Sequence, residues 1–143
     1  MALVNIEDIE KLEYDPMQKT HEEEIMMLNE IDELATRFKT DETVKEELEE
    51  KIEAYVDHVV DHFENEERLM LVHNFSGYSM HKMEHDRVLQ QFDEFYIPWK
   101  KEGDIWGMIE FLRRTPKWIK EHIAAMDRMT SLSIDNIAEM KIG

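Results

Sequence analysis

Two pairs of potential metal ligands are each separated by four positions in the sequence. His62 and Glu66 form one pair, within "DHFENEE", and His81 and His85 form the other, within "MHKMEHD". Side chains four residues apart lie on the same face of an α-helix, with Cβ atoms roughly 6 Å apart. If both segments are helical, each pair therefore presents two ligands to one centre.

Three further potential ligands lie outside these pairs. His21 is followed at helical spacing by Ile25 and Leu28, which places it at the edge of an apolar stripe. His122 and Asp127 are five positions apart, which corresponds to about 140° around an ideal helix, too wide for one face. If both reach one centre, the helix is distorted there or the carboxylate approaches from the side.

Each of these residues also has an explanation without a metal. A histidine pair can occur by chance on an exposed helix, and the run "ENEE" around Glu66 is typical of a solvated face. His122 and Asp127 could form a surface ion pair. The metal interpretation depends on the coincidence of a histidine beside apolar positions in each of four predicted helices. We expect His73 at the surface and His58 in solvent, or alternatively against the site one helical turn away.

The composition restricts both the chemistry and the partners. The chain has no cysteine, which excludes disulfides, thiolate zinc sites, iron–sulfur clusters and a thiol nucleophile. A metal would be held by imidazole and carboxylate groups, which suit iron, manganese or zinc. The formal net charge of −17 opposes binding to nucleic acid and to anionic membranes. We therefore expect no nucleic-acid partner and no membrane partner.

The length and hydropathy pattern indicate a single domain over residues 1–143. No apolar run approaches the roughly 18 residues of a membrane-spanning helix. The first residues, "MALVNIEDIEKLEYD", are acidic and lack the features of a secretory signal. We therefore expect a cytoplasmic protein.

The elements that must position the candidate ligands are predicted to be helices. Only four glycines and three prolines occur, and residues such as Glu, Lys, Leu, Met and Ala, which favour helix, dominate. After an N-terminal arm over residues 1–15, we expect helices over residues 16–38, 42–72 and 80–95, the last ending before Pro98. In the turn after the second helix, Gly77 is expected to permit a left-handed conformation.

The fourth helix is predicted in two pieces. Asp104 would cap a short helix through "IWGMIEFLRR", and Thr115 with Pro116 would restart a helix that ends near Met129. Long helices with short connections favour an antiparallel up-down bundle. The predicted fold class is all-α: a four-helix bundle over about residues 16–130, with an N-terminal arm and a short C-terminal tail.

In these residues the sequence resembles the hemerythrin family, particularly its single-domain bacterial members. The family pattern has one histidine on the first helix, then H-x-x-x-E, H-x-x-x-H and H-x-x-x-x-D on the next three. This chain has each part in order, with matching context in "MQKTH", "HFENEE", "GYSMHKMEH" and "WIKEHIAAMD". The five-residue spacing on the fourth helix belongs to the family pattern. The resemblance spans about residues 14–130.

The resemblance implies two non-haem iron ions inside the bundle, joined by an oxo or hydroxo bridge. The implied ligands are five histidines and two bridging carboxylates: His81, His85 and His122 on one iron, His21 and His62 on the other, and Glu66 and Asp127 between them. This set leaves one coordination position open, on the iron that has two histidines.

The function that the resemblance implies is reversible binding of dioxygen at the open position, for carriage, storage or delivery and without catalysis. Sequence spacing from the candidate ligands predicts five side chains for the pocket around the open position. All five would also belong to the bundle core: Ile25, Leu28, Phe63, Trp118 and Ile119. An interruption at Pro116 would change access to this pocket. Dioxygen is the expected ligand, and the sequence does not identify a protein that would accept it.

Other functions would use a similar bundle. A di-iron enzyme, such as a peroxidase or a nitric oxide reductase, would need a proton source, for which Tyr78, His58 and His73 are candidates. An oxygen or redox sensor would need a signalling domain, which we do not recognise in the sequence. A ferritin-like protein would carry Glu-x-x-His motifs and a zinc hydrolase an H-E-x-x-H motif, neither of which occurs.

Overall fold

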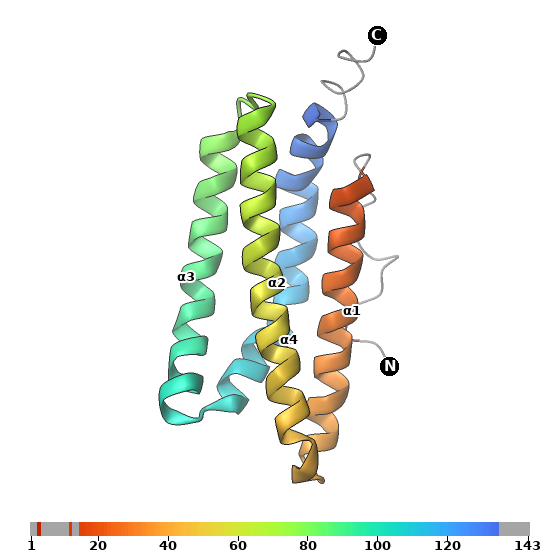
Figure 1. Ribbon diagram of the computed structural model, residues 1–143, viewed down its shortest axis with the longest axis vertical. Coiled ribbons are helices and arrows are strands. Elements are labelled where there is room, and N and C mark those ends of the chain that lie inside the picture. Colours follow the sequence, from red (N-terminus) through yellow and green to blue (C-terminus); the bar gives the residue numbers. More distant parts are fainter. Residues whose placement is uncertain (1–2, 4–11, 13–14, 135–143) are drawn as a thin grey trace.

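Four α-helices form an antiparallel bundle in the computed structural model (Figure 1), which describes residues 3, 12 and 15–134. The helices are α1 (Asp15–Phe38), α2 (Lys45–Val72), α3 (Tyr78–Glu102) and α4 (Ile105–His122). Each helix packs against the next, and α4 packs back against α1, which closes the bundle. The predicted all-α up-down fold is confirmed, while most of the expected arm and tail lies outside the described residues.

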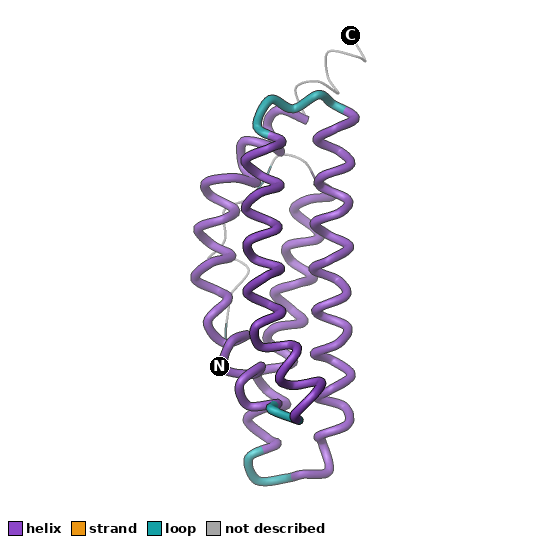
Figure 2. Tube along the Cα trace, turned by 90° about the vertical axis from the view of Figure 1, so that its left-hand side faces the viewer, coloured by secondary structure: helices purple, strands orange, loops and turns teal. Residues whose placement is uncertain are grey.

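The loops lie at the two ends of the bundle (Figure 2), and no strand occurs within residues 15–134. None of the helices in this described part is long and apolar enough to cross a membrane. The bundle is held by apolar stripes with helical spacing, since side chains at three- and four-residue intervals face the core. Those of the first two helices are buried: Ile25, Leu28, Ile31, Leu34 and Ala35 on α1, and Leu48, Ile52, Tyr55, Val59 and Phe63 on α2.

Asp41 lies between the first two helices, at the break that the predicted ranges 16–38 and 42–72 leave open. Its carboxylate accepts a hydrogen bond from the Thr43 backbone N–H at 3.0 Å, which caps the 3₁₀ turn Glu42–Val44 that leads into α2. In the next turn the prediction for Gly77 is wrong, because its φ is −86°. Asn74 takes the left-handed conformation instead, with φ 53°, and asparagine tolerates this region better than most residues.

The prediction that the third helix ends before Pro98 is also wrong, because α3 continues to Glu102. Pro98 has no N–H to donate to the carbonyl of Glu94, so the helix loses one hydrogen bond there. Beyond the proline, Trp99 is buried with 4% of its surface exposed, and burial of a large side chain contributes about 1.5–3 kcal/mol. Gly103, with φ 75°, then ends the helix in a left-handed cap.

The predicted interruption at Thr115 and Pro116 is absent, because α4 runs through both residues without a break. Pro116 cannot donate to the carbonyl of Leu112, four residues earlier. The Thr115 hydroxyl donates to that carbonyl instead, at 2.7 Å. Thr115 therefore supplies the hydrogen bond that the proline removes, and it acts inside the helix rather than as a cap. Beyond α4, helical structure continues through residue 134, past the predicted end near Met129.

Candidate metal centre

The four helices bring their histidines and carboxylates together in two adjoining groups inside the bundle. The larger group contains Glu66, His81, His85, His122 and Asp127, and the smaller contains His21, His62, Glu66 and Asp127. Within each group, one nitrogen or oxygen atom from every residue lies within 4.8 Å of the others. Both groups are buried, and they share the two carboxylates. All seven residues singled out in the sequence are therefore in one place.

The five histidines turn the same ring nitrogen, Nε2, toward the shared carboxylates. On the smaller group's side, Nε2 of His21 lies 3.0 Å from Asp127 and Nε2 of His62 lies 2.5 Å from Glu66. The Nε2 atoms of the other three point inward as well, at 2.9 Å from Asp127 for His81 and His122, and at 3.2 Å from Glu66 for His85. A convergent set of imidazole nitrogens and carboxylate oxygens has the composition of an iron, manganese or zinc site.

Three of the histidines are fixed by a hydrogen bond at the other ring nitrogen, Nδ1. Nδ1 of His62 lies 2.6 Å from Glu24, and Nδ1 of His85 lies 3.1 Å from Glu67. Nδ1 of His81 lies 2.8 Å from the Thr130 hydroxyl. A partner at one ring nitrogen sets the tautomer and leaves the other nitrogen free to bind a metal.

A π-helical turn over Ile123–Asp127 accounts for the five-residue spacing of His122 and Asp127. The Arg128 backbone N–H donates to the carbonyl of Ile123, five residues earlier, so this turn holds one residue more than an α-helical turn. The widened turn brings Asp127 Oδ1 to 2.9 Å from His122 Nε2. Of the two options that the spacing left open, the structure shows the distorted helix.

Aromatic rings pack against the histidines of the larger group. The Phe63 ring is parallel to the His85 ring, with centroids 3.9 Å apart, and Trp118 stacks on His122 at 4.7 Å. The Trp118 indole N–H donates to Glu84 at 3.1 Å. These contacts restrict the orientation of the imidazoles and keep water away from them.

The surroundings of the buried carboxylates favour their ionised form. Burial by itself would raise the pKa of Glu66 and Asp127, but the facing histidines hold the pKa of both carboxyls well below their usual range. Burial likewise opposes protonation of His81, yet the adjacent carboxylates of Asp127 and Glu66 raise its pKa to about 9. Buried carboxylates need compensating positive charge, which protonated imidazoles or metal ions provide.

Several nitrogen and oxygen atoms in the cluster are buried without a hydrogen-bond partner. Such atoms show whether these residues suit metal ions, because a bound ion would provide the missing partner. They are both oxygens of Asp127, Oε1 of Glu66, both nitrogens of His21, Nε2 of His85 and Nδ1 of His122. Most of these atoms lie within about 3 Å of a group in the cluster but lack hydrogen-bond geometry. Apart from Nδ1 of His21 and of His122, which lie on the other side of their rings, these atoms face one another without bonding, which fits a bound cation. The donor set therefore suits metal.

A cavity of about 20 Å³ adjoins the two groups, and the candidate ligands that line it are His21, His62, His122 and the shared Asp127. It exceeds the roughly 10–15 Å³ that one water molecule needs, so it can hold a small ligand. Of the five predicted pocket residues, Phe63, Trp118 and Ile119 line this cavity. Ile25 and Leu28 are buried but belong to the bundle core and are not part of its lining.

Polar residues that sequence reasoning missed also line the cavity: Glu24, Tyr55 and Thr115. Glu24 is 5% exposed, and although burial would raise the pKa of its carboxyl, His62 and His58 lower it. His58 Nε2 lies 3.0 Å from Glu23, and its Nδ1 lies 3.5 Å from Glu24. For His58 the sequence left two positions open, in solvent or against the site, and the structure shows it against the site. Among the described residues that line the cavity, none is a predicted proton source.

The chain has clear similarity to known proteins. A family model described as "Hemerythrin HHE cation binding domain" matches residues 12–130. A protein of Aquifex aeolicus strain VF5 named Bacteriohemerythrin is 36% identical over 116 residues, which cover 80% of this chain and 85% of the relative. No solved structure gave a significant match.

Proposed function

The chain belongs to the hemerythrin family, and on that basis we propose that its buried cluster is a di-iron centre that binds dioxygen reversibly. Family membership implies binding of two iron ions, and the clustered side chains supply the donors. We assign His81, His85 and His122 to one iron, and His21 and His62 to the other. Glu66 and Asp127 would bridge the two ions, together with an oxo or hydroxo group.

The observation that carries this proposal is the asymmetry of the two groups beside the cavity. Three histidines serve one side and two serve the other, and the cavity is lined by both histidines of the smaller group but by only one histidine, His122, of the larger group. An iron with fewer protein ligands keeps a coordination position for a small molecule. A pair of ferrous ions would supply the two electrons that reversible binding of dioxygen requires.

The protein's own residues would keep this binding reversible by limiting water in the cavity. Most of the lining side chains that are not candidate ligands are apolar: Val59, Phe63, Phe92, Trp118, Ile119 and Ile123. The size of the cavity excludes all but the smallest ligands. Binding without turnover agrees with the name of the Aquifex relative, which describes a bacterial hemerythrin and no enzymatic reaction.

The test combines metal analysis with visible spectroscopy. Iron is quantified, the protein is reduced under argon, exposed to air and purged again with argon. We expect about two iron ions per chain and a charge-transfer band that appears in air and fades on purging. Direct and permanent conversion to the oxidised spectrum would contradict reversible binding, and fewer than two ions would contradict the ligand assignment.

Glu24 favours a second candidate, a di-iron enzyme of the peroxidase or nitric oxide reductase type. Its carboxylate and the Tyr55 hydroxyl belong to side chains that line the cavity, and both groups can exchange protons. Catalytic consumption of hydrogen peroxide or nitric oxide by the iron-loaded protein, lost in Glu24→Gln at equal iron content, would favour this enzyme over the carrier.

A further inference from the structure

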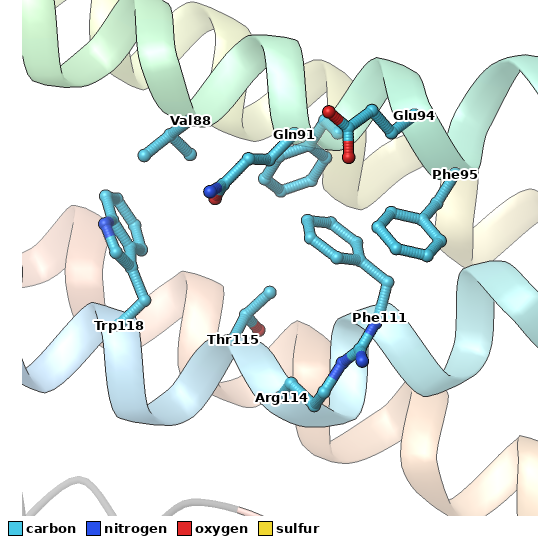
Figure 3. Close-up of a pocket in the computed structure, with 9 residues that line it drawn as sticks. Val88, Gln91, Glu94, Phe95, Phe111, Arg114, Thr115 and Trp118 are labelled. Atoms are coloured by element: carbon cyan, nitrogen blue, oxygen red, sulfur yellow. The ribbon is translucent and has the colours of Figure 1, made fainter.

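A cleft of about 270 Å³ opens between α3 and α4 on the outside of the bundle. Figure 3 shows Val88, Gln91 and Phe95 from α3 facing Phe111, Thr115 and Trp118 from α4 across this space. Four aromatic rings line it, because Phe92 belongs to the same wall. Gln91 is exposed, so its side chain lies where the cleft meets solvent.

The α3–α4 cleft and the cavity beside the metal centre share three lining residues. Phe92, Thr115 and Trp118 line both spaces. Phe92 and Thr115 are 4% and 6% exposed, so only the thickness of these side chains separates the cleft from the cavity. Rotation of these side chains would open a path for a small molecule.

A second cleft of about 270 Å³ lies between α1 and α2 and offers a competing route. Its lining includes Thr20, Asn65 and Arg68, together with His62 and Glu66 of the metal centre. It shares only His62 with the cavity. Charged side chains line both clefts: Arg68 in this one, and Glu94 and Arg114 in the α3–α4 cleft. A path from the α1–α2 cleft would pass the candidate ligands His62 and Glu66. The wall between the α3–α4 cleft and the cavity is formed instead by Phe92, Thr115 and Trp118, which better suits an apolar gas.

We propose that dioxygen and other small neutral ligands reach the metal centre through the α3–α4 cleft, passing between Phe92 and Trp118 over Thr115. This inference rests on the proposed function, because it concerns access to the same site. Phe92 and Trp118 are access residues: they decide how fast a ligand arrives and leaves, whereas the candidate ligands decide how tightly it binds.

The first test blocks the outside of the cleft with Gln91→Trp. The rates of dioxygen association and dissociation are measured by stopped flow and laser photolysis. We expect both rates to fall by about tenfold, with an unchanged equilibrium constant, because a barrier on the path affects both directions equally. The matched control is Asn65→Trp, which places the same ring at an exposed helical position in the α1–α2 cleft and should leave both rates unchanged.

Two results would overturn the access route: unchanged rates in Gln91→Trp, or slower rates in Asn65→Trp alone. Failure of the wild-type protein to bind dioxygen at all would instead refute the proposed function. The route can then still be tested without iron chemistry or variants, because dissolved dioxygen is paramagnetic and accelerates the relaxation of nearby methyl groups.

The second test uses protein loaded with zinc, which accepts the same imidazole and carboxylate ligands and is diamagnetic. Under dioxygen pressure, we expect stronger relaxation of the Val88 and Thr115 methyl groups than of Leu69, which lines the α1–α2 cleft. Ile119, at the cavity, should be affected as well. Relaxation concentrated at Leu69 would contradict access through the α3–α4 cleft.

Discussion

Glu24 Oε1 lies 2.6 Å from Nδ1 of His62, and both side chains are buried. This contact joins α1 to α2 beside the metal centre and directs Nε2 of His62 toward Glu66. Burial alone would lower the pKa of His62, but Glu24 and Glu66 raise it well above its usual value. Glu24 therefore acts through a candidate ligand: it orients His62 and stabilises positive charge there.

Replacement of Glu24 should weaken metal binding on the side of the two histidines. Loss of a carboxylate partner from a metal-binding histidine costs about 10–100-fold in affinity, and we expect an effect of this size in Glu24→Gln. Iron retained per chain during titration with a chelator measures it. Glu23→Gln is the control, because Glu23 is exposed and bonds to His58 rather than to a candidate ligand. Equal effects of both variants would refute a role for Glu24 in orienting His62.

Removal of single ligands should distinguish the two halves of the centre. His21 belongs only to the smaller group. His21→Ala should therefore retain about one metal ion per chain, held by the larger group, whose three histidines are all intact. Glu66 belongs to both groups, so Glu66→Ala should weaken the binding of both metal ions.

Metal analysis after gel filtration tests the ligand assignment, with Glu64→Ala as a control at an exposed position two residues from Glu66. The control should bind as much metal as the wild type. Retention of equal amounts of metal by His21→Ala and Glu66→Ala would contradict the shared position of Glu66.

Thr115→Val should destabilise the fold because it leaves the Leu112 carbonyl without a donor. A buried acceptor without its partner costs about 1–3 kcal/mol, and Leu112 is 1% exposed. In a Pro116→Ala background the same substitution should cost much less, because the alanine N–H donates to this carbonyl. Urea unfolding of the four proteins in the cycle measures both costs. Equal costs in the two backgrounds would show that Thr115 does not compensate for the proline.

His58 should contribute to stability in a pH-dependent way. Hydrogen bonding to Glu24 raises its pKa above the ordinary value of 6.5, although partial burial opposes the shift. A raised pKa in the folded state means that the stabilisation is fully present below pH 6.5 and is lost as the pH rises through the folded-state value. The difference in free energy of unfolding between the wild type and His58→Gln should therefore shrink as the pH rises above 6.5. A difference that grows with pH would contradict this interpretation.

The positions of the seven candidate ligands were predictable because helical spacing converts sequence separation into direction. A regular helix is enough to direct His62 and Glu66 to one centre, and the same holds for His81 and His85. The first pair lies on α2 and the second on α3. His122 and Asp127 do not fit a regular helix, and the misfit itself indicated the distortion that the π-helical turn provides. The same spacing predicted the apolar stripe of Ile25 and Leu28 beside His21, and both residues are buried.

The features that the sequence did not reveal depend on contacts between helices. Prolines are strong signals for helix ends, but the burial of Trp99 and the Thr115 hydroxyl keep α3 and α4 intact past Pro98 and Pro116. Glu24 stands in the acidic run "HEEEI", where composition favours a solvated face. The signal that was overlooked is its position three residues after His21, on the same face of α1.

The most direct test of the central claim is the recovery of dioxygen after it has been bound. The reduced, iron-loaded protein is equilibrated with gas labelled on both atoms with oxygen-18 and then purged with argon, and the released gas is analysed by mass spectrometry. A carrier releases doubly labelled dioxygen, about one molecule for each pair of iron ions, and remains reduced through repeated cycles. Release of labelled water or hydrogen peroxide, with oxidised iron left behind, would contradict reversible binding.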